Sequence, residues 1–131
     1  MSKRTTASEA EISRAIMDYL AARHVLTYRM NTGACEAVYK GKTRFLRFGT
    51  PGMADLLAFQ RVKIHGKYFT VPWFIEVKSE HGKQSELQRS FERQVKDNGI
   101  EYLLARSVDD VDQALLRFQS EAVGQQDTRK R

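Results

Sequence analysis

The chain has 131 residues, of which 41% are hydrophobic and 29% are charged, and its formal net charge is +6. This length suits one domain with a single hydrophobic core. Apolar runs are only a few residues long and the first residues are polar, so we expect neither a membrane span nor a secretion signal. The single cysteine, Cys35, excludes an internal disulfide and a multi-cysteine metal site. A soluble protein of the reducing cytoplasm fits these features best.

The basic residues occur in groups, which is a pattern found in proteins that bind nucleic acids. Basic residues are grouped about as often on solvent-exposed faces that bind no partner. A nucleic-acid-binding surface and a solvated face therefore both stay open as interpretations. Aromatic residues are interleaved with the first of the groups. The groups are Lys40, Lys42, Arg44 and Arg47; Arg61, Lys63 and Lys67; and 129–131.

The N-terminal segment predicts a loose arm over 1–7 followed by a helix. Two overlapping capping boxes, Thr6 to Glu9 and Ser8 to Glu11, precede apolar residues at helical spacing. The helix is predicted over 9–23. The apolar positions of its buried face are Ile12, Ile16 and Leu20.

The middle of the chain changes to the pattern of β-strands. Lys40-Gly41-Lys42 predicts a hairpin turn, and the glycines and proline of 49–52 predict a loop. A second turn is predicted at 64–67. The predicted strands cover 25–31, 35–39, 43–48, 54–60 and 68–78.

The last part of the chain predicts helix, strand and helix. Ser85 and Gln88 form a capping box ahead of Leu87, Phe91 and Val95, and Asn98-Gly99 ends that helix. A buried strand follows over 100–105. A third helix, capped by Ser107, has Val111, Leu115 and Phe118 on its apolar face. We predict one α/β domain over 8–120, with a central mixed β-sheet flanked by helices, a right-handed crossover and a basic, disordered tail over 121–131.

Two carboxylates occupy positions that suggest chemistry. Asp55 follows the 49–52 loop, and Glu76 lies within an otherwise apolar strand, two residues before Lys78. Side chains two apart on a strand share a face, so Glu76 and Lys78 project together. If the two strands are neighbours, Asp55 converges on them. Paired carboxylates suit a hard divalent cation, and a nearby lysine can orient or deprotonate a water or stabilise charge on a phosphate.

These residues resemble the PD-(D/E)XK nuclease signature in the arrangement Asp…Glu-x-Lys. More narrowly, the chain resembles a stand-alone VRR-NUC domain of the kind found in phages and bacteria, over roughly residues 8–118. Pro51 is separated from Asp55 by three residues, which departs from the literal signature. The segments that carry the resemblance are Arg29 to Gly33, Phe48 to Asp55, Phe74 to Lys78, and Gly82 with Gln88.

The resemblance implies a restriction-endonuclease-like fold and hydrolysis of DNA phosphodiesters with Mg²⁺, for which Mn²⁺ would substitute. Asp55 and Glu76 would bind the metal with the backbone carbonyl of Val77, and Lys78 would be the catalytic lysine. Gln88 would lie near the active centre. An acidic residue on the first helix often completes such sites, and Glu9 is chosen over Glu11 because it shares the inward face of Ile12.

The resemblance also implies a substrate and a partner. Stand-alone members act on branched DNA such as four-way junctions, commonly as homodimers. We expect the basic stretch from Lys40 to Arg47 and the 61–67 hairpin to follow the DNA backbone. The predicted DNA-binding residues are Arg29, Asn31, Lys40, Lys42, Arg44 and Arg47.

Each assignment has a plainer structural alternative. Asp55 could cap a turn, and Glu76 with Lys78 could be an ion pair on a solvated face. Glu9 and Gln88 each fit a helix cap, and Arg29 and Asn31 could merely end a strand. A non-cleaving binding module, or a nuclease for linear DNA or RNA, is the alternative function.

Overall fold

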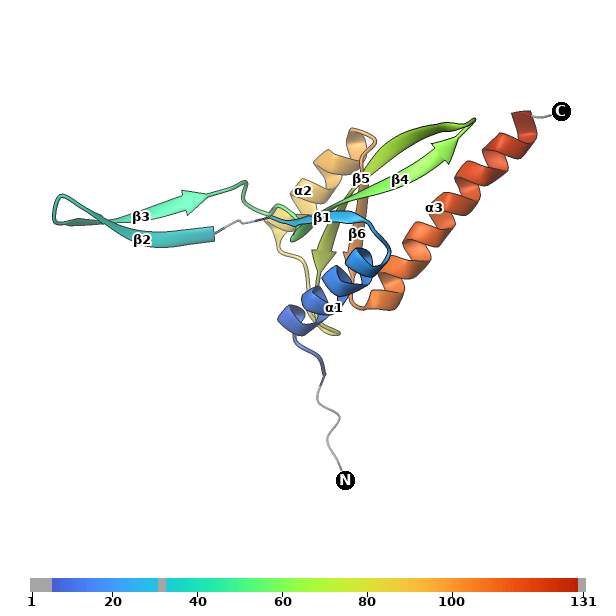
Figure 1. Ribbon diagram of the computed structural model, residues 1–131. Helices are drawn as coiled ribbons and strands as arrows, with labels where there is room; N and C mark the ends of the chain where they lie inside the picture. The colour runs from blue at the N-terminus through green and yellow to red at the C-terminus, as the bar shows by residue number, and fades with distance from the viewer. Residues whose placement is uncertain (1–5, 31–32, 130–131) are drawn as a thin grey trace, which may run out of the picture.

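The computed structural model describes residues 6–30 and 33–129, and within them helices and strands alternate along the chain (Figure 1). The elements are α1 (Glu9–Ala22), β1 (Leu26–Arg29), β2 (Gly33–Tyr39), β3 (Lys42–Phe48), β4 (Leu56–Ile64), β5 (Lys67–Val77), α2 (Glu86–Asp97), β6 (Glu101–Ala105) and α3 (Val108–Arg129).

Four strands form the central sheet, in the order β1-β4-β5-β6. β1 is antiparallel to β4 and β4 to β5, whereas β5 and β6 are parallel. The parallel pair requires a crossover, which α2 provides. The predicted α/β fold with a central mixed sheet is therefore confirmed.

The two faces of the sheet are covered by different helices. Alternate residues of β5, Trp73, Ile75 and Val77, pack in one core with residues of α1 and α3. Phe74 points the other way and packs with Phe91 of α2. Because successive side chains of a strand alternate between faces, Glu76 belongs to the α2 side. This alternation places a carboxylate beneath the first turn of α2.

The hairpin of β2 and β3 is separate from the central sheet. It forms a two-stranded sheet of its own, and Figure 1 shows it extending away from the body. The predicted turn is confirmed, with φ of 51° at Lys40 and 73° at Gly41. Our expectation that these strands join one sheet was wrong. The two strands hydrogen-bond to each other over their whole length, and the edge position beside β4 is occupied by β1.

Two helices differ from their sequence patterns. Leu87, predicted on the buried face of α2, is 59% exposed, because the first turn of α2 meets the 50–54 loop through its backbone instead. α3 continues past Ser120 to Arg129. Residues 121–129 contain no proline and several good helix formers, which explains the continuation. Within the described ranges, no helix is both long and apolar enough to span a membrane.

Candidate active site

The site lies where β4 begins and β5 ends. Leu56 pairs with Ile75 in the antiparallel register, so Asp55 stands beside Glu76. Oδ2 of Asp55 accepts a 2.7 Å hydrogen bond from the Val77 N–H. The carbonyl of Asp55 accepts a 2.8 Å hydrogen bond from the Met30 N–H, which ties the position to the end of β1. Thus the carboxylates from two separate stretches of chain converge, as the sequence predicted.

Gly52 fixes the loop that leads into Asp55. Its φ is +81°, and a Cβ built there would lie 2.3 Å from the carbonyl oxygen of Leu87 in α2. Only glycine combines this left-handed backbone with such a close approach. The loop therefore packs directly on the first turn of α2, and this contact sets Asp55 against the residues of that turn.

Glu76 is a buried carboxylate whose partners do not fully satisfy it. It is 1% exposed, and its Oε1 accepts a 3.0 Å hydrogen bond from Nε2 of Gln88. Its Oε2 is buried and has no hydrogen-bond partner among the residues that the structure describes. Burial raises the pKa of Glu76 to about 8, and the nearby negative charge of Asp55 adds to the increase.

Lys78 lies on the same side as Glu76. Its Nζ is 3.8 Å from Oε1 of Glu76, and its side chain is only 12% exposed. The backbone N–H of Lys78 donates to the carbonyl of Ala105 at 3.0 Å, which extends the pairing with β6. A solvent-exposed ion pair, the plainer alternative for these two residues, does not describe this geometry.

Gln88 serves the helix cap and the carboxylate together. The capping box with Ser85 is formed, because Oε1 of Gln88 accepts from the Ser85 N–H at 2.9 Å. The other end of the same amide is the donor to Glu76. The helix cap that the sequence predicted is therefore formed, and the same side chain also contacts the Glu76 carboxylate.

Glu9 opens α1 beside the other carboxylates. The N-cap of α1 is Ser8, whose side chain accepts from the Glu11 N–H, so Thr6 and Glu9 do not form the cap. Glu9 borders a pocket of about 330 Å³ together with Asp55, Val77 and Arg29. Glu11 lines a different pocket, which agrees with the choice of Glu9 over Glu11 as the residue facing the site.

Arg106 is a residue that the sequence analysis missed. Its Nη1 donates to the carbonyls of Ser79, Glu80 and Gly82 at 2.6, 3.3 and 2.8 Å. These carbonyls belong to the turn that follows Lys78, and Gly82 in turn lies against Glu9, since a Cβ there would be 3.3 Å from Oε1 of Glu9. No local pattern signals this role, because the arginine acts on carbonyls distant in sequence.

The predicted DNA-binding residues are not gathered in one place. Arg29 borders the pocket, whereas Lys40 and Lys42 are exposed at the turn of the β2–β3 hairpin, away from it. Asn31 and the side chains of Arg44 and Arg47 lie outside the described residues.

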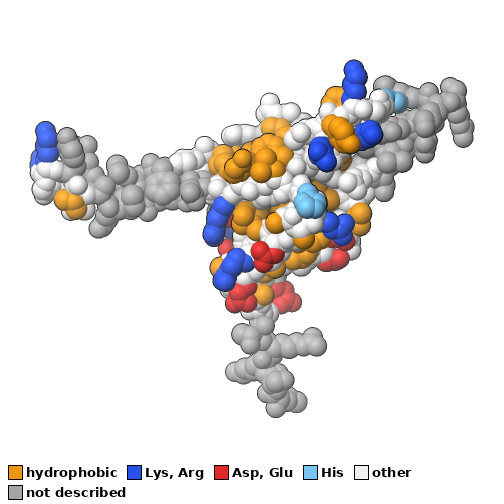
Figure 2. Space-filling model, in the orientation of Figure 1, with side chains coloured by type: hydrophobic (Ala, Val, Ile, Leu, Met, Phe, Trp, Pro, Cys, Tyr) orange, Lys and Arg blue, Asp and Glu red, His pale blue; other side chains and the backbone are white. Residues whose placement is uncertain are grey.

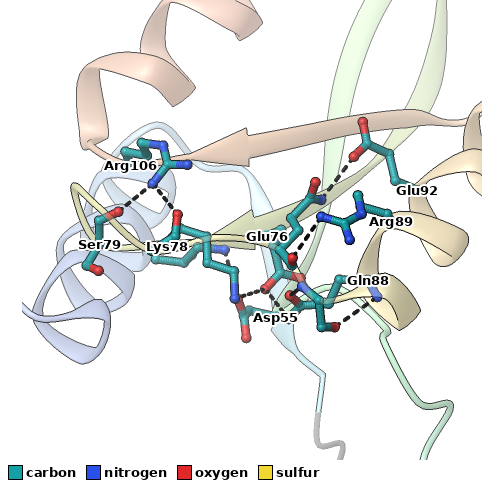
Figure 3. A network of polar contacts seen from close by, with 12 residues as sticks. Asp55, Glu76, Lys78, Ser79, Gln88, Arg89, Glu92 and Arg106 are labelled. Atoms are coloured by element: carbon teal, nitrogen blue, oxygen red, sulfur yellow. Dashed lines mark hydrogen bonds and ion pairs between the residues drawn. The ribbon is translucent and has the colours of Figure 1, made fainter.

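Figure 3 shows Asp55, Glu76, Lys78 and Gln88 turned toward one another, with Arg106 at the adjoining turn. A divalent cation fits this donor set, because Asp55 and Glu76 bring two carboxylates together and Oε2 of Glu76 is buried without a hydrogen-bond partner among the described residues. Across 6–30 and 33–129 no three His, Cys, Asp or Glu side chains form a group able to hold a metal. Magnesium commonly binds through one or two carboxylates and keeps several waters, so two carboxylates and a carbonyl are sufficient.

Comparison with known proteins assigns the chain to a family. The family model of the VRR-NUC domain matches residues 8–109. A solved structure described as a VRR_NUC domain is 21% identical, with a TM-score of 0.52, over 82% of this chain and 94% of that one, which supports the fold. No curated protein matches the chain. The chain belongs to the VRR-NUC domain family and is a nuclease-type domain.

Proposed function

We propose that the protein is a metal-dependent endonuclease that hydrolyses DNA phosphodiester bonds and selects branched DNA such as four-way junctions. The proposal rests on one observation: Asp55, Glu76 and Lys78 meet at one end of the β4–β5 pair, where a buried oxygen of Glu76 has no partner in the described part of the chain. Structural carboxylates are normally satisfied when buried, so this arrangement favours a charge-binding role.

The residues would divide the work as follows. Asp55, Glu76 and the carbonyl of Val77 would hold Mg²⁺ or Mn²⁺, and Glu9 would complete the acidic wall of the pocket. A bound divalent ion supplies Lewis-acid chemistry and lowers the pKa of water. The ammonium of Lys78, held beside Glu76, would orient the attacking water or stabilise charge on the phosphate. Gln88 would keep the Glu76 carboxylate in place through its hydrogen bond.

DNA as the substrate is supported by the net charge of +6 and by the family. The preference for branched DNA and a homodimeric state rest on the resemblance noted in the sequence. β1 offers support for a dimer, because it is an edge strand whose Leu26 and Tyr28 are 57% and 54% exposed. Edge strands with exposed apolar side chains are natural surfaces for association. Light scattering that shows a monomer at micromolar concentration, with and without DNA, would contradict the dimer.

The decisive experiment is cleavage of a labelled four-way junction by the wild type and by Lys78→Ala, each with Mg²⁺ and with chelator. We expect cutting only by the wild type with metal, and a loss of at least about 100-fold in the variant. A panel of flap, fork, linear duplex, single-stranded DNA and RNA substrates tests the preference for branched DNA. Metal-independent cutting, or full activity of the variant, would refute the mechanism; binding without cleavage would point to a non-cleaving module.

A further inference from the structure

The far end of the β4–β5 pair carries a basic surface that the active site does not use. The 20 residues from Leu56 to Ile75 contain no Asp or Glu, yet include Arg61, Lys63 and Lys67. Figure 2 shows blue Lys and Arg side chains at this tip, while red acidic side chains lie on the lower body near α1. The far end of these strands therefore carries basic residues, whereas Asp55 and Glu76 lie at the other end.

The side chains at the tip are exposed and ordered by an aromatic ring. Arg61, Lys63 and Lys67 are all exposed, and Tyr68 is 61% exposed. The guanidinium of Arg61 lies 4.8 Å from the centroid of the Tyr68 ring, and Nζ of Lys63 lies 5.4 Å from it. Cation–π contacts of this kind restrain two flexible cations over one ring. The charged groups of Arg61 and Lys63 are thus both kept close to the Tyr68 ring.

Arg61, Lys63 and Tyr68 share a sheet face with the buried carboxylate, whereas Lys67 begins β5 on the opposite face. Tyr68 and Glu76 are separated by an even number of residues on β5, and Lys63 pairs with Tyr68 across the strands. Lys67, at the far end of the tip, pairs with Ile64, so the full length of the nine-residue β4 strand separates it from Asp55. At the rise of a β-strand this separation is roughly 30 Å. That length corresponds to about nine base pairs of B-form DNA, from the spacing of phosphates along one strand.

We propose that the tip formed by Arg61, Lys63, Lys67 and Tyr68 binds the phosphate backbone of a duplex arm about nine base pairs from the bond that is cut. The inference rests on the proposed function, and adds to it a length requirement for the substrate. Duplex DNA is the occupant that the surface favours, because exposed lysines and arginines without acidic neighbours on these strands complement phosphates.

The test is cleavage of junctions whose arms are shortened stepwise from 20 to 5 base pairs, by wild type, a tip variant and a matched control. The tip variant is Lys63→Ala/Lys67→Ala. The control, Arg93→Ala/Lys96→Ala, removes the same charge from α2. For the wild type we expect kcat/KM to fall about tenfold when the arms become shorter than about nine base pairs. The tip variant should cut short-armed junctions with the same kcat/KM as the wild type, and its kcat/KM should not rise as the arms become longer. In the control, kcat/KM should rise with arm length as it does in the wild type.

Binding in chelator separates this inference from the proposed function. In fluorescence anisotropy, the affinity of the wild type should also fall when the arms become shorter than about nine base pairs. In the tip variant, the slope of the logarithm of the binding constant against the logarithm of the salt concentration should be smaller by about two. If the wild type binds with this step but cuts nothing, the nuclease proposal fails and the tip surface stands. A wild type without a length step, or a tip variant that retains it, would overturn the inference, provided that circular dichroism shows the variant folded.

Discussion

Gln88 donates a 3.0 Å hydrogen bond from Nε2 to Oε1 of Glu76, while its Oε1 accepts from the N–H of Ser85. The start of α2 and the end of β5 are therefore joined through one side chain. Because the capping box holds the amide in a fixed orientation, the helix cap also fixes the direction in which Glu76 faces. A helix terminus in this protein thus positions the carboxylate that we propose to bind the metal.

Replacing Gln88 should affect activity more than stability. Gln88→Ala removes the donor to Glu76, and loss of such a supporting contact typically lowers metal affinity or activity about 10- to 100-fold. Ser85→Ala is the matched control, because it weakens the same cap by about 1 kcal/mol but leaves the Glu76 contact. Thermal unfolding and junction cleavage should show similar stability for the two variants and a larger activity loss for Gln88→Ala. Equal activity losses would assign Gln88 to the cap alone.

The stability of the metal-free protein should depend on pH through Glu76. Its folded-state pKa, about 8, is above the ordinary value of 4.5, so the folded state binds the proton more tightly. The contribution to stability is fully present below pH 4.5 and is lost as the pH rises through 8. In chelator, the melting temperature of the wild type should fall across this window, and Glu76→Gln should flatten the change. A wild-type profile as flat as that of the variant would contradict the assignment.

Divalent cations should reverse this loss, because they compensate the charge of Asp55 and Glu76 above pH 8. We expect Mg²⁺ or Mn²⁺ to raise the melting temperature of the wild type at pH 8 and to leave Glu76→Gln and Asp55→Asn nearly unchanged. One site filled at 100 times its Kd contributes about 2.7 kcal/mol. Differential scanning fluorimetry with a metal titration measures this. Equal stabilisation of all three proteins would place the metal elsewhere.

Gly52 should be the least replaceable glycine near the site. Gly52→Ala combines a left-handed backbone, which costs an alanine roughly 1–2 kcal/mol, with a clash against the Leu87 carbonyl. Gly99 is the matched control, since its φ is +73° but a Cβ there meets nothing within 4 Å. Chemical denaturation should show a clearly larger loss for Gly52→Ala, accompanied by reduced cleavage. Equal losses would mean that the 50–54 loop moves away from α2 without cost.

Arg106 should act as a positioning residue for Lys78 and Glu9. Arg106→Ala removes the guanidinium that donates to the carbonyls of Ser79, Glu80 and Gly82. Among the described residues only the Gly82 N–H still donates to the Ser79 carbonyl, so the backbone after Lys78 is held less firmly. We expect kcat to fall about tenfold with little change in KM for DNA, and Arg106→Lys to recover only part, because a lysine ammonium lacks the planar guanidinium that fixes the directions of the N–H donors. A change confined to KM would instead indicate direct contact with DNA.

Periodicity and capping signals predicted most of the fold. Ser8, Ser85 and Ser107 each accept the hydrogen bond expected of a helix cap. The hairpin turns at Lys40-Gly41 and His65-Gly66 also lie where glycine and turn residues predicted them. These features depend on neighbours in sequence, which is why they are readable from it. The separate β2–β3 sheet depends on which strand occupies the edge beside β4, and the exposure of Leu87 depends on how the 50–54 loop approaches α2. Neither can be predicted from the local sequence pattern.

By itself, the sequence identified the residues that we propose to carry the chemistry. The spacing of Glu76 and Lys78 put them on one face of a strand, and Asp55 stood out by its position after the 49–52 loop. The resemblance to the VRR-NUC domain added Gln88 and Glu9. Only the tertiary structure decided that the register of β4 and β5 sets Asp55 beside Glu76 and that the latter is buried with an oxygen lacking a described partner. It also revealed the support of Arg106. Burial and contacts between distant segments arise from packing, whereas local spacing encodes only the direction in which each side chain points.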